Sequence, residues 1–401
     1  MAALQILMFV GLVQLCASSI AWANPLPGQS NTRTPEADSS QPTINLSAFM
    51  DSAHHWRDIR DDDYVIRAHP HQAKHPASAV AEIADNILLL QKDNGGWPKN
   101  YDVQAILTDE QKAALKQASH LTETTTFDNG ATHSHVDYLA AAYAQTHDER
   151  YKRACLHGIE FILSAQYGNG GWPQFYPNPK GYARYITFND GAMIGVMNVL
   201  QKIVRRDARY AFVDQSLRER VKRAFDKGID CILKCQIVDH DTLTVWCQQH
   251  DDVTLLPQSA RTFEPACMSN LESTDITEFL MQLDNPDQRT IRAVEAAAAW
   301  FARAVIHGVR VATVPAPTAA FQYQTVNFDR VVIRDSGALP IWTRFTELGT
   351  HRALFSNRNW KPVYSLAEVD RERRTGYGWY TYAPARIVTE LYPAWKKKWN
   401  E

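Results

Sequence analysis

The sequence Asn-Gly-Gly-Trp-Pro occurs twice, at Asn94–Pro98 and at Asn169–Pro173. Each copy follows an apolar run that ends in glutamine, Ile87–Gln91 in the first case and Phe161–Gln166 in the second. A third run of this kind, Cys231–Gln236, keeps the glutamine but lacks the Gly-Gly-Trp-Pro. The three glutamines lie 75 and 70 residues apart, a length that holds about two helices with their loops. The repeat therefore predicts a chain built from helical hairpins.

Helical periodicity starts near residue 77 and continues almost to the end of the chain. We expect an all-α fold, an (α/α)3 toroid of helical hairpins whose long loops form a cleft at one end. One segment, Gln322–Ile333, alternates partly and is expected to form a short strand pair. The expected helices are Ala77–Gln91, Val136–Thr146, Arg150–Gln166, Asp190–Val204, Leu217–Gln236, Asp275–Leu283, Thr290–Val309 and parts of Leu366–Leu391.

Composition and charge limit the classes of partner. The chain has 401 residues, 45% of them hydrophobic, which is enough for a large core. The net charge of −2 indicates no nucleic-acid or membrane partner, and we expect a monomer. Charge is less even locally, because Arg261–Arg374 contains thirteen arginines and a single lysine. The planar guanidinium matches a carboxylate, so this bias suggests a carboxylate-bearing ligand, although most of these arginines are expected in salt bridges.

The N-terminus has the pattern of an export signal. Leu4–Leu15 is mostly apolar, and Ala21–Ala23 forms a small-residue cleavage site. We therefore predict a signal peptide at 1–23 and an exported protein, secreted or periplasmic. Residues 24–74 are predicted to form a linker and an N-terminal arm, because the first part is rich in Pro, Ser and Thr. Residues 75–401 are predicted to form a single domain.

Five cysteines remain after the predicted cleavage site, and their odd number and scattered spacing argue against a disulfide framework. Cys231 and Cys235 lie one helical turn apart and are interpreted as small buried hydrophobic residues. The chain has no Cys-x-x-Cys pair and no His-Glu-x-x-His motif. Zinc is therefore not indicated.

A second repeat carries carboxylates. Thr126–Ala131 (Thr-Phe-Asp-Asn-Gly-Ala) resembles Thr187–Ala192 (Thr-Phe-Asn-Asp-Gly-Ala), and each copy precedes an apolar helical run. Asp128 and Asp190 fit the N-terminal caps of these helices, where a side-chain oxygen meets free backbone N–H groups. The alternative is functional, because both loops would lie at the same end of the fold, where a metal ion could bind between them.

Other loops combine aromatic and polar residues. Trp97–Tyr101, Trp172–Tyr176 and Gly376–Tyr382 could stack on sugar rings or, equally well, wedge their rings between helices. Arg261 lies three residues before Glu264, a spacing that ordinarily indicates a salt bridge. Residue types alone do not make Arg261 catalytic.

Taken together, these motifs resemble those of the polysaccharide lyase family 10 pectate lyases. The resemblance covers roughly 75–392, and eight motifs in the same order make it specific. It implies that 75–401 is a pectate lyase catalytic domain, and the family's (α/α)3 toroid agrees with the hairpin repeat. The motifs are Asn94–Asn100, Thr124–Thr132, Gly170–Pro177, Tyr185–Ala192, Trp246–Thr254, Ala260–Glu264, Trp342–Glu347 and Gly376–Pro384.

The resemblance implies calcium-assisted β-elimination on polygalacturonate (pectate). The C5 proton of a uronate is weakly acidic because its loss adds a second negative charge beside the carboxylate. Ca²⁺ and fixed cations offset that charge. Calcium prefers hard oxygen ligands, which Asp128 and Asp190 would supply together with water and substrate.

The resemblance also assigns the remaining site residues. Arg261 would be the base, an unusual role because a free guanidinium has a pKa above about 12, so nearby cations would have to favour its neutral form. Arg344 and Arg358 would bind substrate carboxylates. Asn129 and Lys99 are further substrate-binding candidates, inferred from their places in the loops.

The chain departs from the family pattern after Arg261, where Thr262–Phe263 replaces Ala-Tyr and Pro265–Asn270 replaces a run of small residues. These departures bear on subsite preference. Two other functions stay open from the residues. An inverting glycosidase would use Asp128 and Asp190 as acid and base, about 6.5–9.5 Å apart. A non-catalytic oligouronide-binding protein would need no base.

Overall fold

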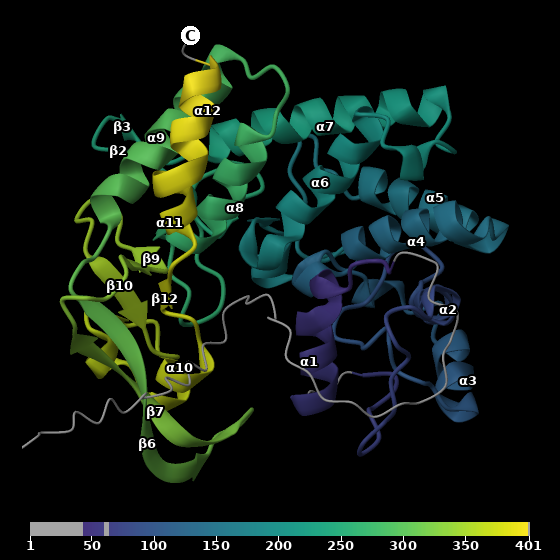
Figure 1. Ribbon diagram of the computed structural model, residues 1–401, viewed down its shortest axis with the longest axis horizontal. Helices are drawn as coiled ribbons and strands as arrows, with labels where there is room; N and C mark the ends of the chain where they lie inside the picture. Colours follow the sequence, from purple (N-terminus) through teal and green to yellow (C-terminus); the bar gives the residue numbers. More distant parts are fainter. Residues whose placement is uncertain (1–42, 60–63, 400–401) are drawn as a thin grey trace, which may run out of the picture. The chain divides into compact units, whose positions relative to one another are not determined.

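The computed structural model describes residues 43–59 and 64–399 (Figure 1). The predicted signal peptide and most of the predicted linker lie outside these residues. The α-helices are α1 (Met50–Asp58), α2 (Val80–Leu90), α3 (Asp109–Gln117), α4 (His133–Thr146), α5 (Glu149–Ser164), α6 (Ala192–Val204), α7 (Gln215–Cys235), α8 (Asn270–Met281), α9 (Gln288–Ala304), α10 (Arg371–Gly376), α11 (Pro384–Arg386) and α12 (Tyr392–Trp399).

Shorter helical turns connect these elements. The first of them, η1, directly precedes α1, whereas η3 and η5 precede α4 and α6. A π-helical turn, η8, joins α11 to α12. The turns are η1 (Ser47–Phe49), η2 (Thr122–Thr124), η3 (Asp128–Gly130), η4 (Gly181–Arg184), η5 (Asn189–Gly191), η6 (Ala208–Tyr210), η7 (Leu366–Glu368) and η8 (Ile387–Leu391).

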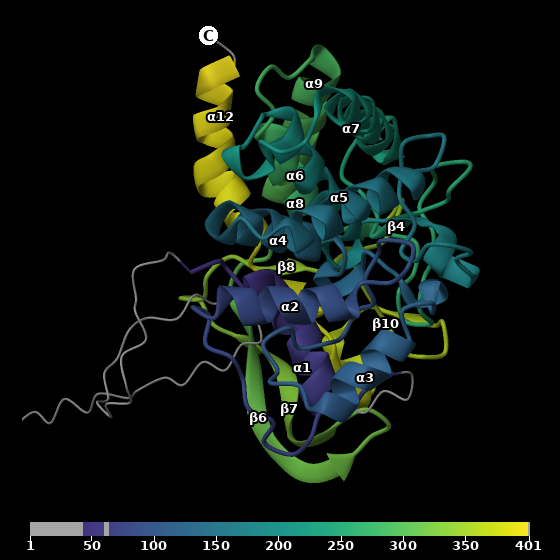
Figure 2. The same cartoon turned by 90° about the vertical axis from the view of Figure 1, so that its right-hand side faces the viewer.

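Consecutive helices pack in pairs, as the sequence repeat predicted: α4 packs against α5, α6 against α7, and α8 against α9. The first members α4, α6 and α8 also lie side by side, as do the second members α5, α7 and α9 (Figures 1 and 2). The helices therefore form two layers. Helix α6, which belongs to the layer of α4, α6 and α8, has most of its side chains buried, as expected for the inner of the two layers. In contrast, α7 buries residues at intervals of three or four and exposes charged residues between them.

Three of the helices end with the same kind of hydrogen bond, from a tryptophan indole to a carbonyl of the last turn. The indole Nε1 of Trp97 donates to the carbonyl of Ile87, Trp172 donates to Ile162, and Trp246 donates to Ile232, over 2.7–2.8 Å. These bonds satisfy carbonyls that have no partner within the helix end. The third hairpin therefore keeps the tryptophan of the repeat at 246, although its Gly-Gly-Trp-Pro is missing.

The glutamines of the repeat join neighbouring helices. Gln91 Nε2 donates to Ala154 O, Gln166 Nε2 to Ala224 O, and Gln236 Nε2 to Ala293 O, over 2.8–3.0 Å. Each amide also donates to a carbonyl in the loop that follows its own helix. The repeated glutamine thus ties the end of one helix both to its own loop and to the next helical hairpin.

The expected all-α fold, the (α/α)3 toroid, is wrong, because the chain contains several antiparallel sheets. The segment Gln322–Ile333, in which we expected a short strand pair, contains one strand, β7, whose partner β6 precedes that segment; the two form a long antiparallel pair. The strands are β1 (Ile186–Thr187), β2 (Val238–Asp239), β3 (Thr242–Leu243), β4 (Gln249–His250), β5 (Met268–Ser269), β6 (Val309–Ala320), β7 (Thr325–Arg334), β8 (Trp342–Thr343), β9 (Phe345–Thr346), β10 (Ala353–Ser356), β11 (Pro362–Val363) and β12 (Tyr380–Thr381).

The strands pair in the orders β11-β10-β9-β5, β6-β7, β1-β4, β12-β8 and β2-β3. The expected helix to Val309 ends instead at Ala304, where β-branched residues that alternate with small and polar ones begin to favour an extended chain. A small apolar cluster lies beneath these strands, separate from the main helical core. It contains Phe263, Cys267, Phe345, Leu354, Phe355, Leu366, Val369, Tyr377 and Trp379.

Gln236 donates two buried hydrogen bonds, so we expect its removal to lower the stability of the protein substantially. Gln236→Ala removes two buried hydrogen bonds and leaves the carbonyl of Thr244 without its donor, whereas the carbonyl of Ala293 keeps the N–H of its own helix. We expect the free energy of unfolding to fall by about 2–3 kcal/mol. Gln215→Ala, at the exposed start of α7, is the matched control and should change it by less than about 0.5 kcal/mol. Urea unfolding followed by tryptophan fluorescence measures both, and equal losses would contradict the role given to Gln236.

Candidate active site

A polar cavity of about 210 Å³ lies where loops from the helical repeats meet the loops of the β-rich segment. Six of the seven residues predicted from sequence line it, although they are spread over almost 250 positions of the chain. The lining residues are Asp51, His55, Lys99, Asp128, Asn129, Gln174, Tyr182, Asn189, Asp190, Gln249, Arg261, Glu264, Arg344 and Tyr377.

Asp128 lies in η3, at the first copy of the repeated loop. Its carboxylate is buried, and Oδ2 is bound by Lys99 Nζ. Burial opposes the charged form, but Lys99 and the amide of Gln174 outweigh it and lower the pKa of Asp128. Oδ1 makes no hydrogen bond within the described chain. Asp128 therefore presents a charged carboxylate with one buried oxygen still available to a ligand.

Asp190 lies in η5, the second copy of the loop, which packs against η3. It is exposed towards the cavity and forms no ion pair with any described residue. Its Oδ2 accepts a 2.6 Å hydrogen bond from Asn189 Nδ2. The enclosing cavity walls and the charge of Asp128 raise the pKa of Asp190 to about 7. Asp190 is thus a carboxylate whose negative charge lacks a permanent counter-ion.

The two loops have similar backbone conformations but carry aspartate and asparagine in opposite order. The second residue of each turn has a left-handed conformation, with φ 49° at Asn129 and φ 50° at Asp190. Asp128 therefore corresponds to Asn189, and Asn129 corresponds to Asp190. The Asn129 amide is bound to Asn100 Oδ1 at 2.8 Å. The loops carry the same acid and amide in opposite order.

The capping interpretation of this repeat is wrong. The N-cap of α4 is Thr132 and that of α6 is Gly191, and neither makes a side-chain capping bond. Asp128 and Asp190 lie earlier in the chain, inside the short turns η3 and η5. Their carboxylates are consequently free to face the cavity rather than the helix.

Arg261 forms a two-point ion pair with the buried carboxylate of Glu264. Its Nε donates to Glu264 Oε2 at 2.8 Å, and Nη2 contacts Oε1. Tyr377 OH donates to the same carboxylate at 2.8 Å. Burial lowers the pKa of Arg261, but Glu264 outweighs it and raises that pKa well above its usual value. In this state Arg261 is a protonated side chain, 42% exposed to the cavity.

Arg344 is the most deeply buried cation of the cavity. Its Nη2 contacts Glu272 and also donates to Asn189 Oδ1 at 2.8 Å. Its guanidinium lies 4.7 Å from the ring centroid of Tyr377. Its Nε is buried and makes no hydrogen bond in the described part of the chain. Arg344 therefore links the second repeated loop to the β-rich segment and retains one N–H for a ligand.

Arg358, the seventh predicted residue, does not line the cavity. It is paired with Glu372 over 3.1 Å and is 41% exposed. Its guanidinium lies 5.1 Å from the ring of Phe263, and that of Arg261 lies 5.0 Å from the same ring. Arg358 thus flanks the site from beyond Phe263.

Sequence reasoning missed several lining residues. Gln174 directly follows the second Trp-Pro, as Lys99 follows the first, and this analogy could have found it. Gln249 lies one residue beyond the equivalent position after Trp246. Glu264 was interpreted as an ordinary partner of Arg261. Asp51 and His55 gave no signal, because they lie in a polar segment interpreted as an N-terminal arm.

The tryptophans of the repeat are not cleft walls. Trp97 and Trp172 are fully buried and support helix ends, so the wedge interpretation of these loops is confirmed. His133, His135 and His250 are also enclosed, and burial lowers the pKa of His250 to about 4. None of these three histidines lines the cavity. The five cysteines from Cys155 to Cys267 are buried and free, as their spacing predicted.

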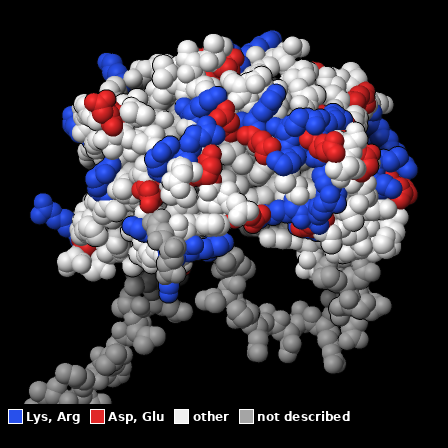
Figure 3. Space-filling view, turned by 90° about the horizontal axis from the view of Figure 1, so that it is seen from above, with Lys and Arg blue, Asp and Glu red and all other residues white. Residues whose placement is uncertain are grey.

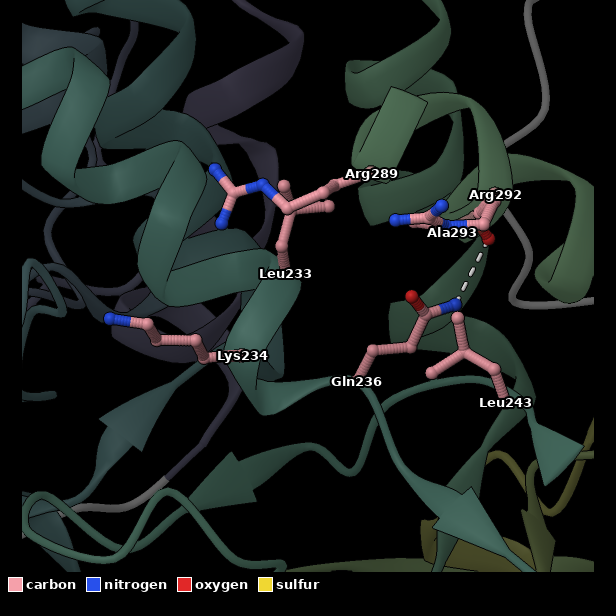
Figure 4. Close-up of a pocket in the computed structure, with 7 residues that line it drawn as sticks. All are labelled: Leu233, Lys234, Gln236, Leu243, Arg289, Arg292 and Ala293. Carbon is pink, nitrogen blue, oxygen red and sulfur yellow. Dashed lines mark hydrogen bonds between the residues drawn. The ribbon is translucent and has the colours of Figure 1, made fainter. Parts of the chain in front are cut away.

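A second cavity, of about 250 Å³, lies at the end of α7 beside α9 (Figure 4). Two of its three cations, Lys234 and Arg289, are paired with Asp230. Gln236 in this cavity donates to Ala293 O, the bond drawn in Figure 4. These contacts support the helix ends and bring no reactive group together.

The face in Figure 3 shows basic and acidic side chains interspersed rather than segregated. Ion pairs such as Lys222–Asp226 and Arg220–Glu160 account for charge of both signs on the described surface. Within residues 43–59 and 64–399, none of the helices combines the length and the apolar character needed to span a bilayer.

The cavity contains oxygen ligands that suit a hard cation. No three His, Cys, Asp or Glu side chains of the described chain gather closely enough to hold a metal by themselves. Asp128 Oδ1 and Gln249 Oε1 are nevertheless buried oxygens without a hydrogen-bond partner there, and Asp190 adds an unpaired carboxylate. Calcium takes six to eight oxygen ligands and accepts water and substrate among them. The donor set fits calcium if a ligand completes it.

Comparisons with known proteins identify the class. Residues 91–388 match the model of the pectic acid lyase family, and the chain belongs to that family. It is a polysaccharide lyase with pectate lyase activity. No curated protein matches it significantly.

Two solved structures are similar. One is a family 10 polysaccharide lyase from Cellvibrio cellulosa, 30% identical, with a TM-score of 0.67, covering 80% of this chain and 92% of its own. The other is a mutant of a Cellvibrio cellulosa family 10 polysaccharide lyase in complex with trigalacturonic acid, 31% identical with the same TM-score and coverage. The family resemblance read from the sequence motifs is therefore confirmed.

The buried pair of Arg344 and Glu272 predicts a large effect on stability. Arg344→Met leaves a buried carboxylate without its cation, and we expect the free energy of unfolding to fall by about 3–5 kcal/mol. Arg358→Met is the matched control, because Glu372 keeps Arg373 as a partner. It should lower the free energy by less than about 1 kcal/mol. Denaturant unfolding measures both variants, and comparable losses would contradict the argument.

Proposed function

We propose that the protein is a calcium-dependent pectate lyase that cleaves polygalacturonate by β-elimination, with Arg261 as the base. The observation that carries this proposal is the convergence of Asp128, Asp190 and Arg261 in one polar cavity. The complex of a similar lyase with trigalacturonic acid supports a uronide substrate. Family membership favours elimination over the glycosidase and the binding protein considered from sequence.

Asp128 and Asp190 would hold Ca²⁺, with the amide oxygen of Gln249 nearby. When bound, calcium would supply positive charge that offsets the anion developing beside the uronate carboxylate. Arg344 would bind a substrate carboxylate through its free Nε, because a planar guanidinium matches a carboxylate. Lys99, while paired with Asp128, and the amide of Asn129 would contact the part of the substrate that lies beside Asp128. Arg358 would bind a carboxylate farther along the chain.

The elimination step follows from the uronide. Arg261 accepts the C5 proton, the electrons of the C5–H bond form the C4=C5 double bond, and the C4–O bond breaks. The departing oxygen takes a proton from solvent, and the product is a 4,5-unsaturated uronide. Arg261 must first lose a proton, which its ion pair with Glu264 opposes. Lys99, Arg344 and a bound cation favour the neutral form, because each destabilises a further positive charge.

We also propose that the protein is exported, to the periplasm or the outside of the cell, and acts there as a monomer. The apolar run and cleavage pattern of residues 1–23 support export. Polygalacturonate is a large polymer, so an enzyme that degrades it must meet it outside the cytoplasm.

Calcium dependence is the first test. We expect wild-type protein to release unsaturated product from polygalacturonate with calcium, measured by ultraviolet absorbance, and to lose this activity with a chelator. Asp190→Asn should lower kcat/KM at least about tenfold at limiting calcium, with partial recovery at high calcium. Asp226→Asn, on the exposed side of α7, is the matched control. Folded protein that gives no unsaturated product at any calcium concentration would overturn the proposed function.

Arg261→Lys tests the base. This variant keeps a cation but changes the geometry and the proton affinity, so we expect kcat to fall about 10²- to 10⁴-fold. Because lysine has a lower pKa than arginine, the rise of the remaining activity with pH should move to lower pH. The control Arg358→Lys should mainly raise KM.

Turnover of Arg261→Lys close to that of wild type would remove Arg261 from the role of base. An unchanged pH profile with reduced kcat would instead assign Arg261 to charge stabilisation. Both outcomes are measured by the same ultraviolet absorbance of the product, so no further assay is needed.

A further inference from the structure

Helix α1 lies outside the segment that matches the family, which begins at residue 91, yet it forms part of the cavity wall. Asp51 and His55 are one helical turn apart and both line the cavity. Their exposed fractions are 49% and 30%, and His55 Nε2 lies 4.0 Å from Asp51 Oδ2. The neighbouring His54 is more exposed and is bound to Asp58. One face of α1 is therefore directed to the cavity and another to solvent.

The helix is fixed to the loops that carry the site. The buried Ser52 Oγ donates to Asn129 O at 2.8 Å and accepts from Asn100 N at 3.3 Å. A single side chain of α1 thus joins the loop of Lys99 to the loop of Asp128. This contact sets α1 directly on η3.

The turn η1, which directly precedes α1, fits closely against η3 and α4. A Cβ on Gly130 would lie 2.3 Å from Ala48 O, so glycine is required there, and its φ of 76° is also unfavourable for other residues. Phe49 packs edge-on against His135 with 5.0 Å between ring centroids. Trp56 is buried and donates to Ile66 O at 3.1 Å. These contacts hold Asp51 and His55 at fixed positions in the wall.

Charge divides the cavity into two ends. Arg261 and Arg344 belong to the β-rich side, where carboxylates would be bound. At the α1 end the one cation, among the described residues that line the cavity, is Lys99, which is neutralised by Asp128. Asp51 adds negative charge there, and burial holds the pKa of His55 below its usual value, so its imidazole is neutral at pH 7. A free carboxylate would gain little at this end.

We propose that α1 forms a sugar subsite that recognises hydroxyl groups and does not require a free carboxylate, so that it accepts a methyl-esterified uronide. This inference rests on the proposed function and specifies its substrate class. A neutral imidazole donates one hydrogen bond and accepts another, and a carboxylate accepts bonds from hydroxyl groups. Such pairs suit the ring hydroxyls of a sugar, which remain when the carboxyl group is esterified.

Kinetics of full-length variants test the subsite. His55→Ala should raise KM for trigalacturonate about tenfold, the effect of losing a hydrogen bond or two, with little change in kcat. His55→Gln, which keeps a donor and an acceptor, should recover most of this loss. The control His54→Ala should match wild type, because His54 lies on the solvent side of α1. Equal KM values for His55→Ala and His54→Ala would overturn the proposal.

The charge at the α1 end of the cavity can be tested separately. Asp51→Lys places a cation at the α1 end, so the ratio of kcat/KM on unesterified pectate to that on partly methyl-esterified pectin should rise at least about fivefold. Asp51→Asn should change this ratio much less. An unchanged ratio for Asp51→Lys would show that no sugar unit is recognised beside α1.

A binding measurement distinguishes a failure of this subsite from a failure of the proposed lyase reaction. In calorimetry with trigalacturonate, adding His55→Ala to the slow Arg261→Lys variant should raise Kd about tenfold. An unchanged Kd would overturn the subsite even if the enzyme is an active lyase. A weaker Kd in a protein whose wild type makes no unsaturated product would support the subsite and refute the proposed reaction. A fall in Tm without a change in Kd would make His55 merely structural.

Discussion

The fold depends on how its helices end. A helix that ends in the interior leaves carbonyls without donors, and each one costs free energy unless a partner is found. Here a tryptophan indole N–H supplies such a donor at three helix ends. The glutamine that follows each of these helices, at 91, 166 and 236, binds a carbonyl of its own loop and one of the next hairpin. Together the two side chains complete the helix end and set the spacing between hairpins. The loops that follow are then held at the same end of the molecule, where the cavity forms.

The cavity concentrates charge but pairs most of it. Lys99 is matched by Asp128, Arg261 by Glu264 and Arg344 by Glu272. Asp190 is the carboxylate at its centre without such a partner, and its pKa is raised accordingly. A divalent cation bound beside Asp190 would relieve this imbalance.

Much of this arrangement could be predicted from the sequence, because repetition reveals equivalent positions. The paired loops indicated Asp128 and Asp190, and the ordered motifs indicated Arg261 and Arg344. The sheets escaped prediction because most strands are only two residues long, too short for any periodicity. The role of α1 also escaped, since a single polar helix of nine residues has no pattern that distinguishes a cavity wall from a solvated arm. Its place depends on Ser52 meeting two loops far along the chain.

The exchanged order of acid and amide in the two repeated loops has one more consequence. Two identical loops related by pseudo-symmetry would present the same face to both ends of a bound chain. Because Asp128 corresponds to Asn189 while Asn129 corresponds to Asp190, the two halves are no longer interchangeable. A polysaccharide has chemically distinct reducing and non-reducing ends. The exchange of two neighbouring residues therefore provides a reason for the polymer to lie across the site in one direction and not the other.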